Sequence, residues 1–419
     1  MSEKKGKIYP QKENGVVASL SFTQPQWEFS YYVKDNFWTS ALPTTASSSF
    51  LQDFLPSQEA TVIELLKKNG YQLLGKTALD EFACGGTGLH AVTGPVVNPH
   101  NPLHVAGGSS SGSAVVVAKK IVPFALGHDT GDSVRRPAAY CGVVGFKPSY
   151  GLISRYGIIP MASSLDTVGI LADKVATVKK IFPLLAQKDP SDLLTTTKKP
   201  KTLLRRKKKI AVIAGLEKNL SAELAGLYRD TQDKLTKLGY SLTEINVPQQ
   251  LRENFLVTYL ILCSAELISH LNSLQGITYG VKDCLSIKKK RSEYLGEIVK
   301  ERLLIGAYCL EEKGSLTKAQ KMRNLINRWL EKVFRDYDFL IFPSTSSVAP
   351  PITNFHARFA GLISSHWSDN LLLLANFAGL PSLSLPIGFS EGLPFGISIN
   401  SAAGQDQVVL ELAAELESE

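Results

Sequence analysis

The sequence predicts an α/β fold built around a large mixed β-sheet. Residues 209–247 give an apolar run, an amphipathic stretch and a second apolar run, which is the pattern of strand, helix and strand. Short apolar runs at residues 339–343, 382–386 and 396–400 predict further strands. No repeat of fixed period is visible, so we expect these elements to alternate within one α/β domain.

The first half of the chain contains the region that an α/β fold would use for chemistry. Residues 59–70 are amphipathic and end in Asn-Gly, which predicts a helix followed by a glycine cap. Residues 71–75 predict a short buried strand. The region from residue 84 to 151 is rich in glycine, serine, threonine and proline but keeps apolar runs. We therefore expect tight turns there, between buried elements.

The predicted domain organisation is an irregular lead-in over residues 1–30 and a single domain over residues 31–419. Residues 189–209 are expected to be linker-like, because a threonine and lysine run with a proline precedes a basic stretch. The elements expected after it are a strand (209–215), a helix (221–239), a strand (240–247), a mostly helical stretch (253–326) and an apolar helix (371–380).

Composition excludes several protein classes. The 419 residues are 44% hydrophobic, enough for a sizeable core. The first fifteen residues are polar and lysine-rich, so we expect no secretory signal, and no uninterrupted apolar stretch approaches the ~20 residues of a membrane span. The five cysteines include no C-x-x-C pair, so neither a zinc site nor a disulfide framework is expected. These features favour a cytoplasmic protein.

The chain carries a formal net charge of +8, with basic clusters at residues 205–209 and 288–291. A cluster of this kind is either solvated surface or a contact for tRNA or another acidic partner. No aromatic residues are interleaved with the basic ones, so the sequence does not strengthen the nucleic-acid interpretation.

Two serines and a lysine supply the parts of an acyl-transfer site without histidine. Ser133 is a hydroxyl that could attack, Ser109 a hydroxyl that could relay protons, and Lys34 an amine that could accept one. Lys34 would have to be neutral, which requires burial, and its neighbours Tyr32, Val33 and Phe37 are apolar enough for that. A lysine in such a run is otherwise a surface residue.

Each serine lies in a segment with more than one interpretation. The run from Gly107 to Ser113 is either a flexible linker or a loop that presents backbone N–H groups at a helix start; the spacing of a phosphate-binding loop is absent. Thr130, Gly131 and Asp132 are either an ordinary turn or a sharp turn whose N–H groups form an oxyanion hole.

The histidines offer weaker alternatives. His90, His104 and His128 lie in the same region, but the chain has neither a Gly-x-Ser-x-Gly elbow nor an H-E-x-x-H metal motif. We interpret these histidines as packing or hydrogen-bonding residues and expect no metal site.

These residues and their spacings resemble the amidase signature family, and within it the glutamine-hydrolysing subunits of tRNA-dependent amidotransferases. The resemblance runs from about Lys34 to Gln405 and is densest between residues 74 and 173. The strings that carry it are LGKT (74–77), DEF (80–82), GPVVNP (94–99), CGVVGFKP (141–148), GLISRYG (151–157), ASSLD (162–166), QGITYG (275–280), KMR (321–323) and NFAGLP (376–381).

The resemblance implies the amidase-signature fold, with helices on both faces of the sheet, and a Ser-cisSer-Lys mechanism. Ser133 would attack the side-chain amide of glutamine, while Ser109, on a cis peptide bond, would shuttle protons to and from neutral Lys34. Backbone amides of Thr130, Gly131 and Asp132 would hold the oxyanion.

For substrate binding, the resemblance implies that Arg323 holds the glutamine α-carboxylate, for which an arginine fork is suited, and Asp369 the α-amino group. Gly85 and Ser110 are also implied as substrate-binding residues.

The resemblance also implies partners. Ammonia would pass to amidotransferase subunits B and C in a heterotrimer, where ATP and Mg²⁺ convert Glu-tRNA(Gln) to Gln-tRNA(Gln). Whether Asp-tRNA(Asn) is also served is left open. No cofactor is expected on this chain itself.

Four departures from the family pattern stand out. Asp132 replaces a usual glycine and His128 a usual small hydroxyl residue. A carboxylate beside an oxyanion hole opposes the developing charge unless its side chain points away, so we expect only the backbone of Asp132 to matter. The stretch before Lys34 is shorter than usual, so we expect flanking N-terminal helices to be missing or rebuilt. The stretch between Arg323 and Asp369, the two residues implied to bind glutamine, is also shorter than usual.

Two other functions remain open from the sequence. A stand-alone amidase on small amides would use the same three residues. A catalytically inactive scaffold would explain Asp132, although the retained Lys34, Ser109 and Ser133 argue against it.

Overall fold

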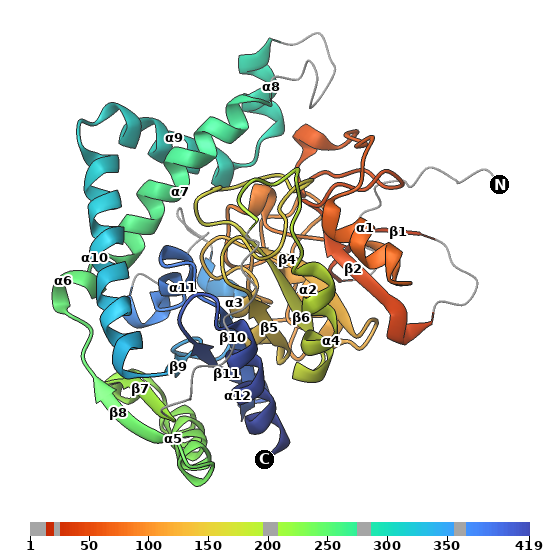
Figure 1. The fold of residues 1–419 in the computed structure, drawn as a ribbon. Coiled ribbons are helices and arrows are strands. Elements are labelled where there is room, and N and C mark those ends of the chain that lie inside the picture. Colours follow the sequence, from red (N-terminus) through yellow and green to blue (C-terminus); the bar gives the residue numbers. More distant parts are fainter. Residues whose placement is uncertain (1–13, 21–25, 196–207, 275–285, 356–365) are drawn as a thin grey trace.

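The computed structural model describes residues 14–20, 26–195, 208–274, 286–355 and 366–419. Within these ranges one sheet of 11 strands forms the centre of the molecule, in the order β1-β3-β2-β4-β6-β5-β10-β11-β9-β7-β8 (Figure 1). Neighbours β2–β3, β2–β4, β7–β8 and β7–β9 run parallel, and the others run antiparallel. The predicted α/β fold with a large mixed sheet is confirmed.

The strands are β1 (Val16–Ser19), β2 (Ser30–Lys34), β3 (Gln72–Thr77), β4 (Phe124–Asp129), β5 (Val144–Lys147), β6 (Thr167–Ala172), β7 (Lys209–Ile213), β8 (Ser241–Ile245), β9 (Phe339–Pro343), β10 (Ser382–Ser390) and β11 (Leu393–Asn400).

The α-helices are α1 (Thr61–Lys68), α2 (Ser111–Ala118), α3 (Arg135–Cys141), α4 (Val175–Leu185), α5 (Ala222–Lys237), α6 (Gln249–Arg252), α7 (Phe255–Asn272), α8 (Ile287–Tyr294), α9 (Glu297–Glu311), α10 (Ser315–Asp336), α11 (Leu373–Phe377) and α12 (Asp406–Ser418). Short 3-10 turns are η1 (Trp27–Phe29), η2 (Ser49–Leu51), η3 (Glu81–Ala83), η4 (Leu216–Asn219), η5 (Ile352–Phe355) and η6 (Trp367–Asn370).

Helices cover both faces of the sheet because successive strand residues point to opposite sides. Leu126 packs into an apolar cluster with α1, α4, α5 and α12. Its neighbour Ala125 belongs to a cluster on the other face, with α2 and α3. Farther along that face, Ala211 packs with α7, α9 and α10, which lie together at one side of the molecule in Figure 1. The expected covering of both faces is confirmed.

Most predicted elements appear with shifted ends. The helix at 59–70 is α1, which begins at Thr61 behind Ala60 and ends before Gly70, whose φ is +82°. The apolar helix expected over 371–380 is only five residues long, because Pro381 and Gly379 end it early. Conversely, β10 and β11 are longer than expected, since a two-residue turn at Glu391 and Gly392 joins them as a hairpin.

Two segments differ from the expected irregular chain. Within the lead-in, β1 pairs antiparallel with β3 and adds the outermost strand at that side of the sheet. In the segment expected to be linker-like, the Asp189 carboxylate accepts hydrogen bonds from Thr61 and Ser154, and Asp192 pairs with Arg155 at 3.2 Å. Residues 189–195 are therefore anchored to the domain. Residues 196–207 lie outside the described residues.

Helix α7 is the one described helix that is long and apolar enough, by length and composition, to cross a membrane. The sequence interpretation, that no stretch approaches a membrane span, did not single it out. In the fold, Phe255, Leu262 and Leu267 on α7 are buried in the cluster that α9 and α10 share. A core helix of a globular protein has this composition, and α7 is packed as one.

Candidate active site

Lys34 and Ser109 lie far apart in the sequence but meet in the core. Lys34 is the last residue of β2, and Ser109 lies in the loop that enters α2. The Lys34 Nζ is 2.8 Å from Ser109 Oγ and 3.1 Å from the carbonyl oxygen of His128. The peptide bond between Gly108 and Ser109 is cis. Parallel pairing of β2 with β4 brings the ends of these strands together, which places the amine beside the loop.

The environment of Lys34 favours a neutral amine. Its side chain is fully buried, and burial lowers its pKa from 10.5 to about 7. The carboxylates of Asp80, Asp129, Asp166 and Asp132 oppose this shift. Near neutral pH a population of uncharged amines is therefore present, and an uncharged amine can accept a proton from a serine hydroxyl.

Ser133 lies in the turn between β4 and α3, next to the Ser109 loop. Its carbonyl oxygen accepts a hydrogen bond from the backbone N–H of Ser110 at 3.0 Å. The residue is 4% exposed, and within the described residues its Oγ has no hydrogen-bond partner. Within the described residues, the Ser109 loop and the Ser133 turn are therefore joined by this backbone hydrogen bond. The hydroxyls of Ser109 and Ser133 are not hydrogen-bonded to each other.

A buried ion pair fixes this turn. The Asp129 carboxylate accepts from Arg135 Nη2 at 3.0 Å and Nε at 3.1 Å, and from the N–H of Val134 at 2.9 Å. Arg135 also donates to the carbonyl of Gly131 at 2.7 Å and to Asn376 at 2.6 Å. Although burial raises it, the pKa of Asp129 is held at about 2 by the Arg135 guanidinium. The sequence interpretation missed this pair, although both residues flank the turn that it singled out.

Four successive backbone N–H groups in the turn have no partner within the described residues, at the predicted positions Thr130, Gly131 and Asp132 and at Ser133. Unpaired N–H groups converging on one point are what an oxyanion hole requires. Gly131 allows the close packing here, because a Cβ at this position would lie 2.8 Å from Leu373 and 2.9 Å from Tyr259. The side chain of Asp132 pairs with Arg136, with 2.5 Å between Oδ2 and Nε.

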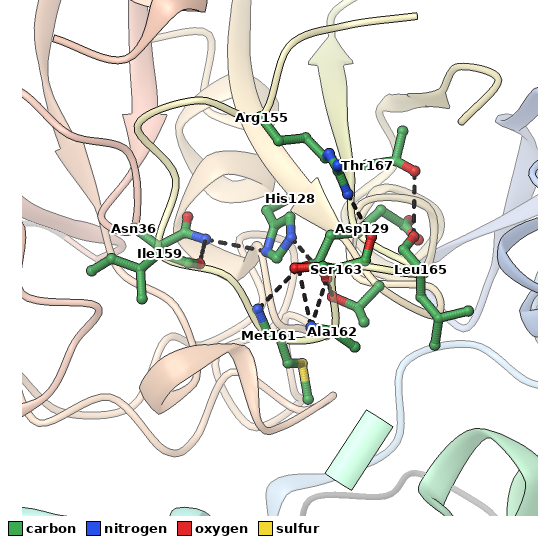
Figure 2. A network of polar contacts seen from close by, with 12 residues as sticks. Asn36, His128, Asp129, Arg155, Ile159, Met161, Ala162, Ser163, Leu165 and Thr167 are labelled. Carbon is green, nitrogen blue, oxygen red and sulfur yellow. Dashed lines mark hydrogen bonds and ion pairs between the residues drawn. The ribbon is translucent and has the colours of Figure 1, made fainter. Parts of the chain in front are cut away.

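His128 belongs to a buried polar network that includes Asn36 and the loop at Met161 and Ala162 (Figure 2). The Asp166 carboxylate lies 3.1 Å from His128 Nε2 and accepts from Thr130 Oγ1 at 2.8 Å. His128 Nδ1 is 3.1 Å from the Asn36 amide. Asp166 also accepts from two backbone N–H groups of its own loop, at Met161 and Ala162. His128 is thus a buried hydrogen-bonding residue, as the sequence predicted.

The same carboxylate is strongly acidic. Burial alone would raise the pKa of Asp166, but His128, Thr130 and the loop N–H groups hold it at about 2. The Asp166 carboxylate is therefore ionised at neutral pH. Its hydrogen bonds with Thr130, Met161 and Ala162 anchor the loop at residues 159–166 to the end of β4.

Arg323 and Asp369 occupy separate positions. Arg323, on α10, donates to the carbonyl of Phe377 at 2.9 Å and to the hydroxyl and carbonyl of Ser164, both at 3.0 Å. Asp369, in η6, accepts from the N–H of Ser346 at 2.9 Å, and its carbonyl accepts from Arg136 at 2.6 Å. Arg136 of α3 therefore links Asp369 to Asp132 in the Ser133 turn, whereas Arg323 donates its hydrogen bonds to Ser164 and Phe377.

Gly85 and Ser110 support the Ser109 loop. A Cβ on Gly85 would lie 2.6 Å from Asp80, so glycine is required beside that buried carboxylate. Asp80, which the sequence interpretation did not assign, accepts from the N–H groups of Gly88 and His90. The Ser110 hydroxyl hydrogen-bonds to the His128 carbonyl at 3.3 Å. Ser110 therefore lies in the loop itself, whereas Gly85 packs against Asp80, the carboxylate that also lies against Gly108 of the loop.

Within the described parts of the chain, no group of three or more histidine, cysteine, aspartate or glutamate residues is arranged to hold a metal ion. Cys84, Cys141, Cys263 and Cys309 are unpaired and buried. Burial raises the pKa of the Cys141 thiol well above its usual value, so this thiol stays protonated. Cys284 lies outside the described residues.

Comparison with known proteins gives a consistent assignment. The family model "Amidase" matches residues 31–410. Two relatives, each named as the A-subunit of glutamyl-tRNA(Gln) amidotransferase, are 37% identical to this chain. The one from Mycoplasma pneumoniae aligns over 92% of this chain and 85% of its own length. The one from Sulfurihydrogenibium aligns over 92% and 82%.

Solved structures are similar over nearly the whole chain. The crystal structure of the glutamyl-tRNA(Gln) amidotransferase A-subunit from Thermotoga maritima superimposes with a TM-score of 0.81 at 28% identity, covering 97% of this chain and 87% of that one. A native peptide amidase from Stenotrophomonas maltophilia gives 0.78 at 28% identity, over 93% and 82%.

Proposed function

This chain belongs to the amidase family, and on that premise we propose that it is the glutamine-hydrolysing subunit of a glutamyl-tRNA(Gln) amidotransferase. The observation that carries the proposal is the buried Lys34 amine, with a pKa lowered by burial to about 7, at 2.8 Å from Ser109 Oγ. The relatives' names favour this amidotransferase subunit over a stand-alone amidase.

In the proposed reaction, the Ser133 oxygen forms a bond to the amide carbon of glutamine and loses its proton through Ser109 to neutral Lys34. The unpartnered N–H groups at residues 131–133 stabilise the resulting oxyanion. The same proton returns to the departing nitrogen as the C–N bond breaks, and ammonia leaves. Water then attacks the acyl-enzyme by the same proton route, giving glutamate and free Ser133.

Glutamine is oriented by groups at the other end of the site. Asp369 binds the α-amino group and Arg323 the α-carboxylate. For Arg323 this requires its guanidinium to exchange a contact with Ser164 for the substrate. Gly85 and Ser110 shape the loop against which the amide lies.

The rest of the reaction takes place on partner chains. Ammonia passes to subunits B and C of a cytoplasmic heterotrimer, where ATP and Mg²⁺ activate the misacylated tRNA. This chain binds no cofactor of its own. The basic helix α8 contains Lys288 and Lys289, which are exposed and available to an acidic partner.

The test is ammonia release from glutamine by the purified chain, alone and co-expressed with subunits B and C, with Ser133→Ala as control. We expect activity that depends on the partners and disappears in Ser133→Ala. Activity on small amides without partners would instead indicate a stand-alone amidase. If Ser133 does not react with a serine-directed acylating reagent, the chain would instead be a catalytically inactive scaffold.

A further inference from the structure

An ion pair lies directly beside the candidate nucleophile. Asp132 precedes Ser133, and its carboxylate lies 2.5 Å from the Nε of Arg136. Arg136 is in the first turn of α3, and its backbone N–H donates to the Asp132 carbonyl at 2.8 Å. The i,i+4 spacing at the start of the helix therefore directs the guanidinium back over Asp132.

The two members of the pair differ in exposure. The Arg136 side chain is 5% exposed and that of Asp132 is 21% exposed. Burial alone would lower the pKa of Arg136, but the Asp132 carboxylate raises it above the usual arginine value. Arg136 therefore stays charged, and it offsets the negative charge of Asp132.

That negative charge lies where it would matter for an oxyanion. The N–H groups at residues 131–133 have no partner within the described residues, and the Asp132 side chain extends from the middle of them. An unpaired carboxylate at this point would repel negative charge that develops on a substrate oxygen, at a short distance and largely shielded from water.

Arg136 also connects the turn to a distant segment. Its Nη2 donates to the carbonyl of Asp369 at 2.6 Å, and the Asp369 carboxylate accepts from Ser346. One guanidinium thus contacts both Asp132 and Asp369, which lie more than two hundred residues apart in the sequence. Its Nη1 is buried and has no partner within the described residues.

We propose that Arg136 is a positioning residue, which neutralises Asp132 beside the oxyanion hole and ties the Ser133 turn to the Asp369 segment. The second part rests on the proposed function, because it assumes that Asp369 holds glutamine. The first part concerns any oxyanion formed at Ser133, so the two parts have different readouts.

The first experiment is a double-mutant cycle of wild type, Arg136→Gln, Asp132→Gly and the double variant, all in the co-expressed complex. Its readout is the rate at which a fluorophosphonate modifies Ser133, which needs no glutamine. We expect Arg136→Gln to slow the modification by about tenfold or more, and the double variant to recover most of that loss. A double variant as slow as Arg136→Gln overturns the charge argument.

The second readout is glutamine hydrolysis by the same four proteins. In the double variant kcat should recover, because the unpaired carboxylate is gone. KM should stay raised, because the contact with the Asp369 carbonyl is lost in both variants. If Arg136→Gln and the double variant both have the KM of wild type, the contact between Arg136 and Asp369 does not support glutamine binding, and this part of the proposal is wrong. If the four proteins show the expected fluorophosphonate rates but none of them hydrolyses glutamine, the neutralisation of Asp132 by Arg136 stands and the proposed function is wrong.

Two further variants separate these effects from folding. Arg136→Lys keeps the charge but cannot span both partners, so it should keep the fluorophosphonate rate within about threefold of wild type while raising KM. A rate as slow as that of Arg136→Gln contradicts the proposal. Arg229→Gln breaks an exposed ion pair of 3.0 Å with Glu217, far from the site in sequence, and serves as the matched control with no expected change.

Discussion

The two ends of the candidate site are built in different ways. At the reactive end, Lys34 comes from β2 and Ser133 from the turn after β4, and these two strands pair in parallel. The loop before α2, which carries Ser109, is joined to them by the hydrogen bonds from Lys34 to Ser109 and from the Ser110 N–H to the Ser133 carbonyl. The proposed substrate end consists of Arg323 from α10, which donates hydrogen bonds to Phe377 and Ser164, and Asp369 from η6, which accepts from Ser346 and Arg136. The reactive end is therefore held by strand pairing and buried charge, whereas the proposed substrate end is held by hydrogen bonds between side chains and neighbouring groups.

The largest expected effect is at the reactive end. Replacing Lys34 by methionine removes the proton acceptor but keeps an unbranched chain in the same buried space. We expect glutamine hydrolysis to fall by about 10²- to 10⁴-fold. Glutaminase assays on the assembled complex measure this. Activity within tenfold of wild type would show that another group accepts the proton.

The same variant should be more stable than wild type. Burial lowers the pKa of Lys34 from 10.5 to about 7, so the unfolded chain binds an additional proton between these values. The folded state is therefore penalised most at pH 7 and below, and the penalty disappears as pH rises toward 10.5. Urea unfolding at pH 7 and pH 9 should show a larger gain for Lys34→Met at pH 7.

Breaking the buried ion pair should affect stability more than any change at the substrate end. Arg135→Gln leaves the Asp129 carboxylate buried without its counter-ion, and we expect a loss of about 3 to 5 kcal/mol in the free energy of unfolding. Denaturant unfolding measures it. As a control, Arg323→Gln should cost clearly less, because its partners are neutral groups.

Acidification should act through the reactive end. Only neutral Lys34 accepts a proton, so kcat/KM should decline below the lysine pKa of about 7, roughly tenfold per pH unit. A profile of kcat/KM from pH 5 to 9 tests this. A flat profile through this range would mean that Lys34 does not titrate there.

The smallest effect is expected from a conservative change at the substrate end. Arg323→Lys keeps the charge but loses the planar fork, so KM for glutamine should rise by about tenfold with little change in kcat. Steady-state kinetics separate the two constants. A fall in kcat with unchanged KM would place Arg323 at the reactive end and remove the contrast between the two regions.

Local pattern was sufficient for much of the fold and for the residues of the reactive end. Regular alternation predicted the strands and helices around α5, because a strand or helix that buries one face must repeat its apolar residues at the matching period. Small residues around Ser109 and Ser133 marked the turns. The strand β1 was missed, because it has only four residues and follows a polar segment. So short a strand shows too little alternation of apolar and polar residues to be recognised.

Long-range pairing decided what local pattern could not. The sequence by itself determined the α/β class, the candidate residues Lys34, Ser109 and Ser133, and the absence of a regular metal motif. Only the tertiary structure showed that Asp129 pairs with Arg135 and that Arg136 pairs with the Asp132 carboxylate. It also showed that Arg323 donates hydrogen bonds to Ser164. Side-chain periodicity reports which face of an element is buried, but charge pairing depends on which elements the sheet order brings together.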